Sequence, residues 1–328
     1  MDARITKSRL ANLLSYDWLK IIAAILAVVL ILIVFFTTIK TRARDEQIFT
    51  VYAYSTPDSV SEGDADMTLY SGADADAFSD RALANGVFSY DVLNVEFENF
   101  GTDSYSEQLF AARRMAGQGT VMFVSDYISP DKDPEEVELV STLDLLFSSQ
   151  SKSFALDTVQ YFEDCEAYLQ RFFGENWREG TLDEAEAEAC FLARNEKDNR
   201  YHLASQKEQG IEDEKLRLEK LREDFIFVLD NCFETGLYTH TEVTVGKEEE
   251  AFEGTYAINV GALPSLRKFV YHYVAGEGSG EQNVQSSEDI CLVLLNNDRE
   301  EGKGGDITND LRFEPVSFLR YLYEEYGA

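Results

Sequence analysis

The run from Ile21 to Ile39 constrains this chain more than any other feature, because it holds no charged residue and consists mostly of Ile, Leu, Val and Phe. Each such residue contributes roughly −0.3 to −0.6 kcal/mol to the insertion of a helix into a membrane. The length of the run suits the hydrocarbon core of a bilayer, which takes about 20 residues of helix. We therefore predict a transmembrane helix over residues 21–39.

A cleaved signal peptide is the competing interpretation of the same run. Signal peptides have a shorter apolar region, followed by a cleavage site with small residues in the A-x-A pattern. Neither feature is present, and no cysteine directly follows the run as a site for a lipid. An uncleaved single span, with the lipid bilayer as its partner, is the better interpretation.

Basic residues on the two sides of the run predict its orientation, because the side richer in Lys and Arg stays in the cytoplasm. Four basic residues precede the run and three follow it: Arg4, Lys7, Arg9 and Lys20, then Lys40, Arg42 and Arg44. We expect a cell-membrane protein with residues 1–20 as a cytoplasmic tail and residues 45–328 as an extracytoplasmic domain.

That domain is strongly acidic, with 22 basic and 59 acidic side chains. Such a surface repels nucleic acid, so no nucleic-acid partner is expected. Four cysteines lie in the domain without any C-x-x-C spacing, which argues against a zinc site: Cys165, Cys190, Cys232 and Cys291. Buried free thiols are the simplest interpretation, and the three possible disulfide pairings stay open.

Residues 91–126 are typical of a β-α-β unit. Leu93, Val95 and Phe97 alternate with polar residues, as in a strand. Ser104 and Glu107 have the spacing of a capping box, in which each side chain satisfies a backbone N–H of the first helical turn. The apolar steps of the helix that follows predict an inner face of four residues: Tyr105, Leu109, Ala112 and Ala116. Residues 121–124 then read as a strand buried on both faces.

Further elements extend this unit in both directions. We predict a first strand over residues 48–55, a short helix over 74–84, and strands over 241–245, 256–260 and 290–295. Between residues 135 and 236 the pattern is mainly helical. It includes a helix capped by Thr181 and Glu184 and a long helix between Gly210 and Gly236. Pro315 is expected at the first position of a C-terminal helix.

Signatures of catalysis are missing from the sequence. There is no G-x-x-x-x-G-K-[ST], H-E-x-x-H or G-x-S-x-G motif. The aspartates between residues 64 and 80 do not follow the spacing of a calcium-binding EF-hand loop. We therefore predict no catalytic residue, no cofactor and no metal site, and expect that the chain is not an enzyme.

The order of elements resembles the extracellular solute-binding proteins of ABC importers. The resemblance is carried by FTVYAYS at 49–55, DVLNVEFENF at 91–100, SEQLFAARRMAGQGTVMFVSD at 106–126 and YAINVG at 256–261. It implies an α/β domain of two lobes, with lobe 1 at about 47–128 and 241–328 and lobe 2 at about 129–240. In this sequence lobe 2 is largely helical, which departs from the family. The chain is also similar to membrane-anchored hypothetical proteins of clostridia-like bacteria.

Candidate ligand-binding residues follow from the ends of the strands. Ligands of open α/β sheets bind beyond the carboxyl ends of the strands, where Ser125, Asp126 and Tyr127 stand. The resemblance implicates Ser125 and Asp126 as well, together with Ser55 and Thr56 at the end of the first strand. A polar turn that merely ends a strand is the alternative interpretation.

Three hypotheses about function remain open on the sequence. The first is a membrane-anchored extracytoplasmic binding protein for a small solute or a protein partner; the resemblance implies association with an ABC permease. The second is a structural or accessory protein of the cell envelope with a degenerate binding cleft. The third, an unrecognised hydrolase, is the least supported, because no motif points to its site.

Overall fold

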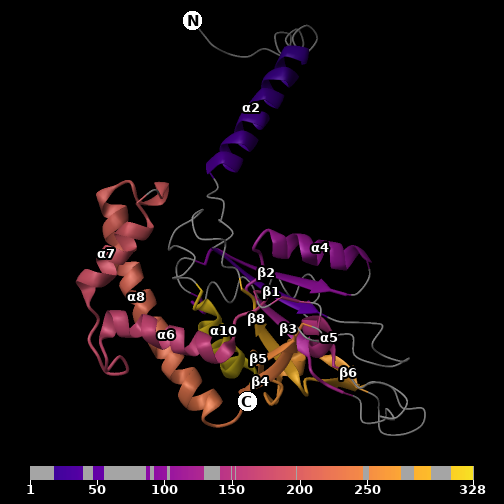
Figure 1. Ribbon diagram of the computed structural model, residues 1–328. Coiled ribbons are helices and arrows are strands. Elements are labelled where there is room, and N and C mark those ends of the chain that lie inside the picture. The colour runs from indigo at the N-terminus through magenta and orange to yellow at the C-terminus, as the bar shows by residue number, and fades with distance from the viewer. Residues whose placement is uncertain are drawn as a thin grey trace, which may run out of the picture. The chain divides into compact units, whose positions relative to one another are not determined.

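The structure, a computed structural model, describes residues 18–39, 47–54, 86–88, 92–101, 104–128, 141–148, 150–151, 153–196, 198–246, 251–274, 284–296 and 312–327. The chain divides into two compact units, residues 1–44 and residues 45–328, which are described separately. Figure 1 labels their elements. The predicted helix at 74–84, the aspartates at 64–80, and Ser55 and Thr56 lie outside the described residues.

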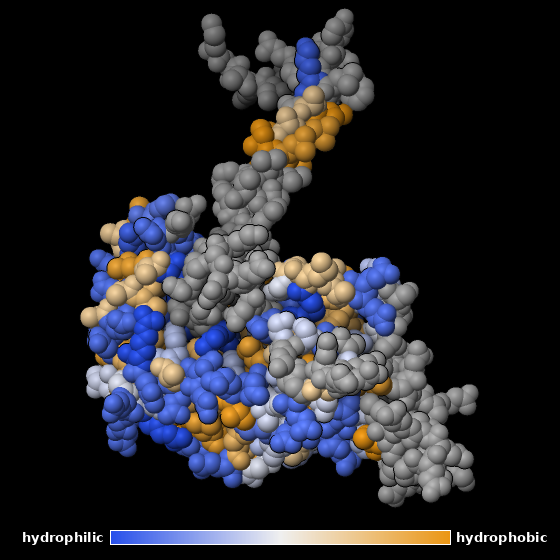
Figure 2. Space-filling model, viewed as in Figure 1, coloured by the Kyte–Doolittle hydropathy of each residue, from blue (hydrophilic) through white to orange (hydrophobic). Residues whose placement is uncertain are grey.

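Helix α2 (Trp18–Ile39) covers the predicted membrane segment in the first unit. Large apolar side chains along it are exposed, and Figure 2 shows them as an orange band: Ile22, Ile25, Leu26, Val28, Val29, Leu30, Ile31 and Leu32. By criteria of length and apolar character, the helices traced through the described residues include none that spans a membrane. The transmembrane helix over residues 21–39 thus stays a prediction.

The second unit is built on a six-stranded mixed sheet with the order β2-β1-β3-β8-β5-β4. Its strands are β1 (Ile48–Tyr54), β2 (Asn94–Phe100), β3 (Val121–Ser125), β4 (Thr239–Val245), β5 (Phe252–Asn259) and β8 (Ile290–Leu294). Strand β1 pairs in parallel with β2 and β3. Strand β8 is antiparallel to β3 and β5, and β4 is antiparallel to β5. The carboxyl ends of β1, β2, β3 and β5 therefore share one edge of the sheet.

Helices cover both faces of this sheet (Figure 1). Side chains alternate along a strand, so Phe49 and Val51 of β1 face one helical layer while Tyr52 faces the other. The first layer holds α6 (Thr158–Phe173), α8 (Ala204–Val228) and α10 (Glu314–Tyr326). The second holds α4 (Ser104–Met115) and α5 (Thr142–Ser148). The β-α-β reading of residues 91–126 is confirmed, with β1 between its two strands.

The mixed α/β class predicted from the sequence is confirmed. The finer description, two lobes with a helical lobe at about 129–240, stays a prediction. Phe162 of α6 and Phe225 of α8 belong to the same hydrophobic core as Phe49 and Phe123 of the sheet. Helix α7 (Glu184–Arg194) packs against α8 at the edge of this core.

Two predicted helix ends are wrong. Helix α7 is capped by Asp183, whose carboxylate accepts from the N–H groups of Ala185 and Glu186 at 3.1 Å, and not by Thr181. Helix α8 begins at Ala204 and runs through Gly210. A Cβ at Gly210 would stand 2.3 Å from the Phe191 ring, so this glycine lets α7 approach α8 instead of starting a helix. A π-helical turn, η4 (Leu229–Phe233), ends α8 before Gly236.

The predicted inner face of α4 is also wrong. Tyr105, Ala112 and Ala116 are exposed, and Leu109 is only half-buried. Of the helix side chains whose burial the structure describes, Phe110 is the buried one, at 7% exposed. Its ring meets the ring of Phe100 at a centroid distance of 5.1 Å and also packs on Tyr52 and Phe154. Because Phe110 packs into this aromatic cluster, the face of the helix that is buried differs from the predicted one.

Smaller elements complete the second unit. Strands β6 (His272–Val274) and β7 (Val284–Ser286) form a separate two-stranded sheet, here called the ribbon. A short 3₁₀ turn, η6 (Leu266–Lys268), precedes the ribbon, and another, η3 (Asn199–Tyr201), precedes α8. Pro315 is the second residue of α10, one position later than predicted but still in the first turn.

Candidate functional site

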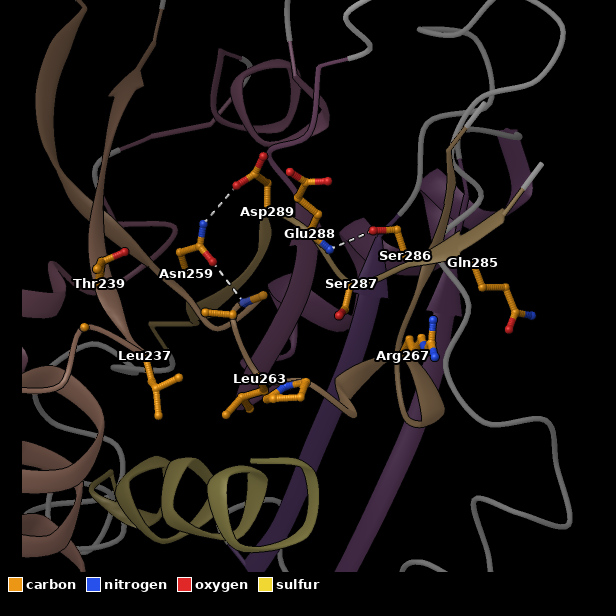
Figure 3. A pocket seen from close by; sticks show the side chains of 14 residues that line it. Leu237, Thr239, Asn259, Leu263, Arg267, Gln285, Ser286, Ser287, Glu288 and Asp289 are labelled. Atoms are coloured by element: carbon orange, nitrogen blue, oxygen red, sulfur yellow. Dashed lines mark hydrogen bonds between the residues drawn. The ribbon is translucent and has the colours of Figure 1, made fainter. Parts of the chain in front are cut away.

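A pocket of about 480 Å³ opens at the edge of the sheet where β5 ends and β8 begins (Figure 3). This is the edge that also carries the carboxyl end of β3, since β8 pairs with both strands. Its lining is mostly polar and comes from four segments: Gly236, Leu237 and Thr239; Asn259 and Gly261–Pro264; Arg267; and Gln285–Asp289. The pocket therefore lies at the position where open α/β sheets bind ligands.

Close backbone packing shapes one wall of the pocket. The N–H of Gly261 donates to Oδ1 of Asn259 at 2.9 Å, which turns the chain directly after β5. A Cβ at Gly261 would stand 2.5 Å from the carbonyl oxygen of Ser287. A glycine is therefore needed to bring the loop after β5 against the turn before β8.

Asp289, in the turn before β8, has an uncommon backbone conformation. Its φ of 52° is in the left-handed region, which non-glycine residues seldom adopt, although Asp is among those found there more often. Its carbonyl oxygen accepts from the N–H of Asp126 at 2.8 Å. Its Oδ1 accepts from Nδ2 of Asn259 at 3.3 Å. Strained backbone of this kind gathers at ligand sites, where the surrounding contacts maintain it.

The charges of the lining favour a polar ligand. Arg267 is exposed and has no ion-pair partner among the residues that the structure describes, in a chain of net charge −32. Glu288 and Asp289 come from the turn before β8. An unpaired guanidinium presents planar N–H donors suited to a carboxylate or phosphate, so the pocket can hold a small solute that carries an acidic group.

The predicted residues Ser125, Asp126 and Tyr127 reach the same edge but do not line this pocket. Ser125 ends β3 and is only 3% exposed. Its Oγ lies 2.7 Å from Nδ1 of His272 and accepts from the N–H of Tyr127 at 3.2 Å. The Tyr127 ring packs on the His272 ring at 5.1 Å.

Asp126 is half-buried beside other acidic groups. Burial raises the pKa of its carboxyl group, a hydrogen bond with Ser141 lowers it, and the charges of Asp144 and Asp289 raise it. The net effect is a raised pKa, so Asp126 is protonated more easily than an ordinary aspartate.

His272 was not predicted as a site residue. It is fully buried, at 0% exposure, and its Nε2 has no hydrogen-bond partner in the described part of the chain. Burial lowers the pKa of its imidazole to about 4, although the nearby charge of Asp289 acts in the opposite direction. No motif surrounds His272, and it meets Ser125 across 147 positions of sequence, so local patterns carry no signal for it.

The Ser125–His272 pair has the spacing of a nucleophile and its base. In a catalytic triad the second ring nitrogen of the histidine bonds a carboxylate, whereas Nε2 of His272 has no such partner among the described residues. Both side chains are closed off from solvent. In this structure the pair is therefore a buried link between β3 and the ribbon.

Asn259, Arg267 and Asp289 are the pocket residues that sequence reasoning missed. Asn259 and Gly261 lie within YAINVG, the segment at 256–261 that carries part of the resemblance, and the glycine directly after a strand is the one available signal. Arg267 and Asp289 stand in loops without a recognisable pattern.

The described residues hold neither a metal cluster nor a disulfide. Within them no three His, Cys, Asp or Glu side chains group so that they could hold a metal ion. All four cysteines are free thiols, three of them buried, in agreement with the simplest interpretation of their spacing. Burial raises the pKa of Cys291 and Cys165 well above the usual range, so these two thiols stay protonated.

Comparisons with known proteins leave the family open. No protein-family model, no curated protein and no solved structure matches the chain. The geometry of the pocket and the character of helix α2 are therefore the basis on which a function is proposed.

Proposed function

We propose that this chain is a membrane-anchored extracytoplasmic binding protein for a small polar solute that carries an acidic group. The observation that carries the proposal is the pocket at the carboxyl edge of the sheet, lined by Arg267, which forms no ion pair with the residues that the structure describes. Its volume of about 480 Å³ is within the range of roughly 300–1,000 Å³ typical of small-molecule sites. The solute would lie between η6 and the turn that holds Asp289.

Helix α2 supports the anchor in this proposal. Residues Val28 to Leu32 are consecutive and each is at least 43% exposed, so the apolar surface extends around more than one full turn. A helix that is apolar on every side is stable when lipid or a protein core surrounds it, because exposed apolar surface is unfavourable in water. A bilayer around residues 21–39 would cover this surface.

A ligand screen tests the binding function. Residues 45–328, which form one compact unit, are screened by thermal shift against amino acids, organic acids, sugar phosphates, sugars, short peptides and metal ions. A ligand at 100 times its dissociation constant stabilises the folded state by about 2.7 kcal/mol, a readily measured shift. We expect a hit from an acidic solute that Arg267→Gln weakens at least tenfold.

Two control variants locate the site. Lys268→Gln changes the neighbouring exposed cation on η6, which does not line the pocket, and should keep the affinity of the unmodified protein. Asp126→Ala should keep it as well. Affinity lost in Asp126→Ala but retained in Arg267→Gln would indicate a site at the end of β3. A ligand whose affinity none of the three substitutions changes would argue against both the pocket and the end of β3.

The alternative function is a structural or accessory envelope protein with a degenerate cleft. The burial of Ser125 under the ribbon favours it, because that predicted ligand contact is not available to solvent. A complete screen without any hit, on protein that melts cooperatively, would favour this alternative over solute binding.

The proposed topology predicts that residues 45–328 are digested when intact cells are treated with a protease that cannot cross the membrane. The reason is the excess of Lys and Arg before residue 21. Immunoblotting of the surviving fragments is the measurement. Survival in intact cells, with digestion after the membrane is opened, would place the domain in the cytoplasm.

A further inference from the structure

The ribbon forms part of the pocket wall without belonging to the large sheet. Its strands β6 and β7 pair over three residues each. An isolated two-stranded ribbon of this size is marginally stable in water, so docking onto the rest of the protein must hold it in place. Two pocket-lining residues, Gln285 and Ser286, belong to β7, and three more, Ser287 to Asp289, form the turn that follows it.

His272 joins the ribbon to the large sheet. It is the first residue of β6, is fully buried, and meets Ser125 at the end of β3 at 2.7 Å. The ring of Tyr127 packs on the imidazole from the segment after β3. Displacing His272 from this position would therefore detach β6 from the edge of the sheet.

The site around the imidazole is suited to the neutral ring and not to the protonated ring. A protonated histidine has two N–H donors. The Nδ1–H can donate to Oγ of Ser125, but an Nε2–H finds no acceptor among the described residues. A buried N–H without an acceptor and a buried charge are both unfavourable.

Few titratable groups of the described chain act on this ring. Tyr127 packs on it from the segment after β3. Asp289, from the turn before β8, is the charged group whose field reaches it and favours protonation, but burial outweighs that charge. Asp126, next to Ser125, is not among the groups whose charge acts on the ring. Proton uptake therefore has to be coupled to exposure of the ring.

We propose that His272 is an acid-sensitive latch: when it takes up a proton, the ribbon leaves the edge of the sheet, and the part of the pocket wall that β7 forms leaves with it. Release of a bound solute at acidic pH is the consequence, and this consequence alone rests on the proposed function. The movement of the ribbon is independent of any ligand.

The size of the response follows from linkage. The imidazole has a pKa of about 4 when docked and about 6.5 when released to solvent. Docking is fully favoured above pH 6.5 and weakens as the pH falls towards 4, because the released form binds the proton more tightly. Between pH 7.5 and pH 4.5 the equilibrium constant for opening should rise roughly 50- to 100-fold.

Hydrogen–deuterium exchange of the full-length protein in non-ionic detergent micelles tests the latch without a ligand. Exchange times at pH 7.5 and pH 4.5 are corrected for the intrinsic pH dependence of amide exchange. We expect peptides that contain residues 270–274 and 284–289 to lose protection roughly 50- to 100-fold at pH 4.5, while those of β1 and β3 keep theirs.

His272→Asn removes the titrating group but keeps an amide that can bond Ser125, so its ribbon should show the same corrected protection at both pH values. His202→Asn changes an exposed histidine and should behave as the unmodified chain. If His272→Asn does not fold, His272→Phe replaces it, since it fills the apolar site without any polar atom.

Unchanged ribbon protection in the unmodified chain, or an equal pH response in a folded His272 variant, would overturn the latch. If the ribbon opens at pH 4.5 but no ligand is found, the latch proposal stands and the proposal of solute binding fails. If a ligand is found, its affinity should fall at pH 4.5 in the unmodified chain and not in His272→Asn.

Discussion

Glu214→Ala should lower the free energy of unfolding of residues 45–328 by about 3–5 kcal/mol, because it removes a buried carboxylate that two buried guanidinium groups bond. The Glu214 carboxylate bonds Arg194 at 2.5 Å and Arg217 at 2.8 Å, and all three side chains are at most 3% exposed. Burial alone would raise the pKa of Glu214, but the two guanidinium groups lower it to about 2. The carboxylate is therefore ionised throughout the physiological range.

Urea denaturation followed by circular dichroism measures this loss. Glu212→Ala on the same helix is the matched control: Glu212 is 64% exposed, and its partner Lys215 keeps a second contact with Glu184. We expect the control to change the free energy of unfolding by at most about 0.5 kcal/mol. Losses of similar size in the two variants would show that the Glu214 network is not buried as described.

Phe110→Ala should cost about 3–5 kcal/mol, as is typical when a buried aromatic side chain is removed from a packed core. The Phe110 ring lies between α4 and the sheet, with the rings of Tyr54 and Phe100 at 5.7 and 5.1 Å. Tyr105→Ala on the same helix is the control, because Tyr105 is 73% exposed. Its removal should change the free energy of unfolding by at most about 0.5 kcal/mol.

Thermal and urea unfolding of the two variants decide which face of α4 is buried. A larger loss of unfolding free energy for Tyr105→Ala than for Phe110→Ala would support the face predicted from the sequence, in which Tyr105 points inward. Leu109→Asp adds a graded case, since Leu109 is half-buried and packs at the margin of the same cluster. Its cost should fall between those of Phe110→Ala and Tyr105→Ala.

Errors in the predicted helices share one physical cause. Alanine is compatible with either a buried or an exposed position, so Ala112 and Ala116 do not indicate which face of α4 is buried. Phe110 and Leu109 are adjacent, and either could have pointed inward. Tyr52 and Phe100, brought together by pairing of β1 with β2, selected Phe110. Gly210 similarly predicted a helix end from its sequence position. The structure places it inside α8, where the close approach of Phe191 requires a glycine.

Local patterns determined the elements that carry their own period. Alternation in β2, the uninterrupted apolar run of β3, and the proline at the start of α10 depend on neighbours within a few residues, and each was predicted from the sequence. The acidic surface and the apolar run at 21–39 are likewise properties of composition. Strand ends followed from the same patterns, which is why Ser125 and Asp126 were found at the carboxyl edge.

Tertiary structure decided which of those strand ends forms a site. Antiparallel pairing places β8 between β3 and β5, and so joins Asn259 to Asp289 at a sequence separation of 30. The ribbon brings His272 onto Ser125 across 147 positions. No periodicity encodes such contacts, because they depend on which strands pair and not on the residues beside them. The sequence thus determined the elements and the edge, while long-range pairing made the pocket and closed Ser125 beneath the ribbon.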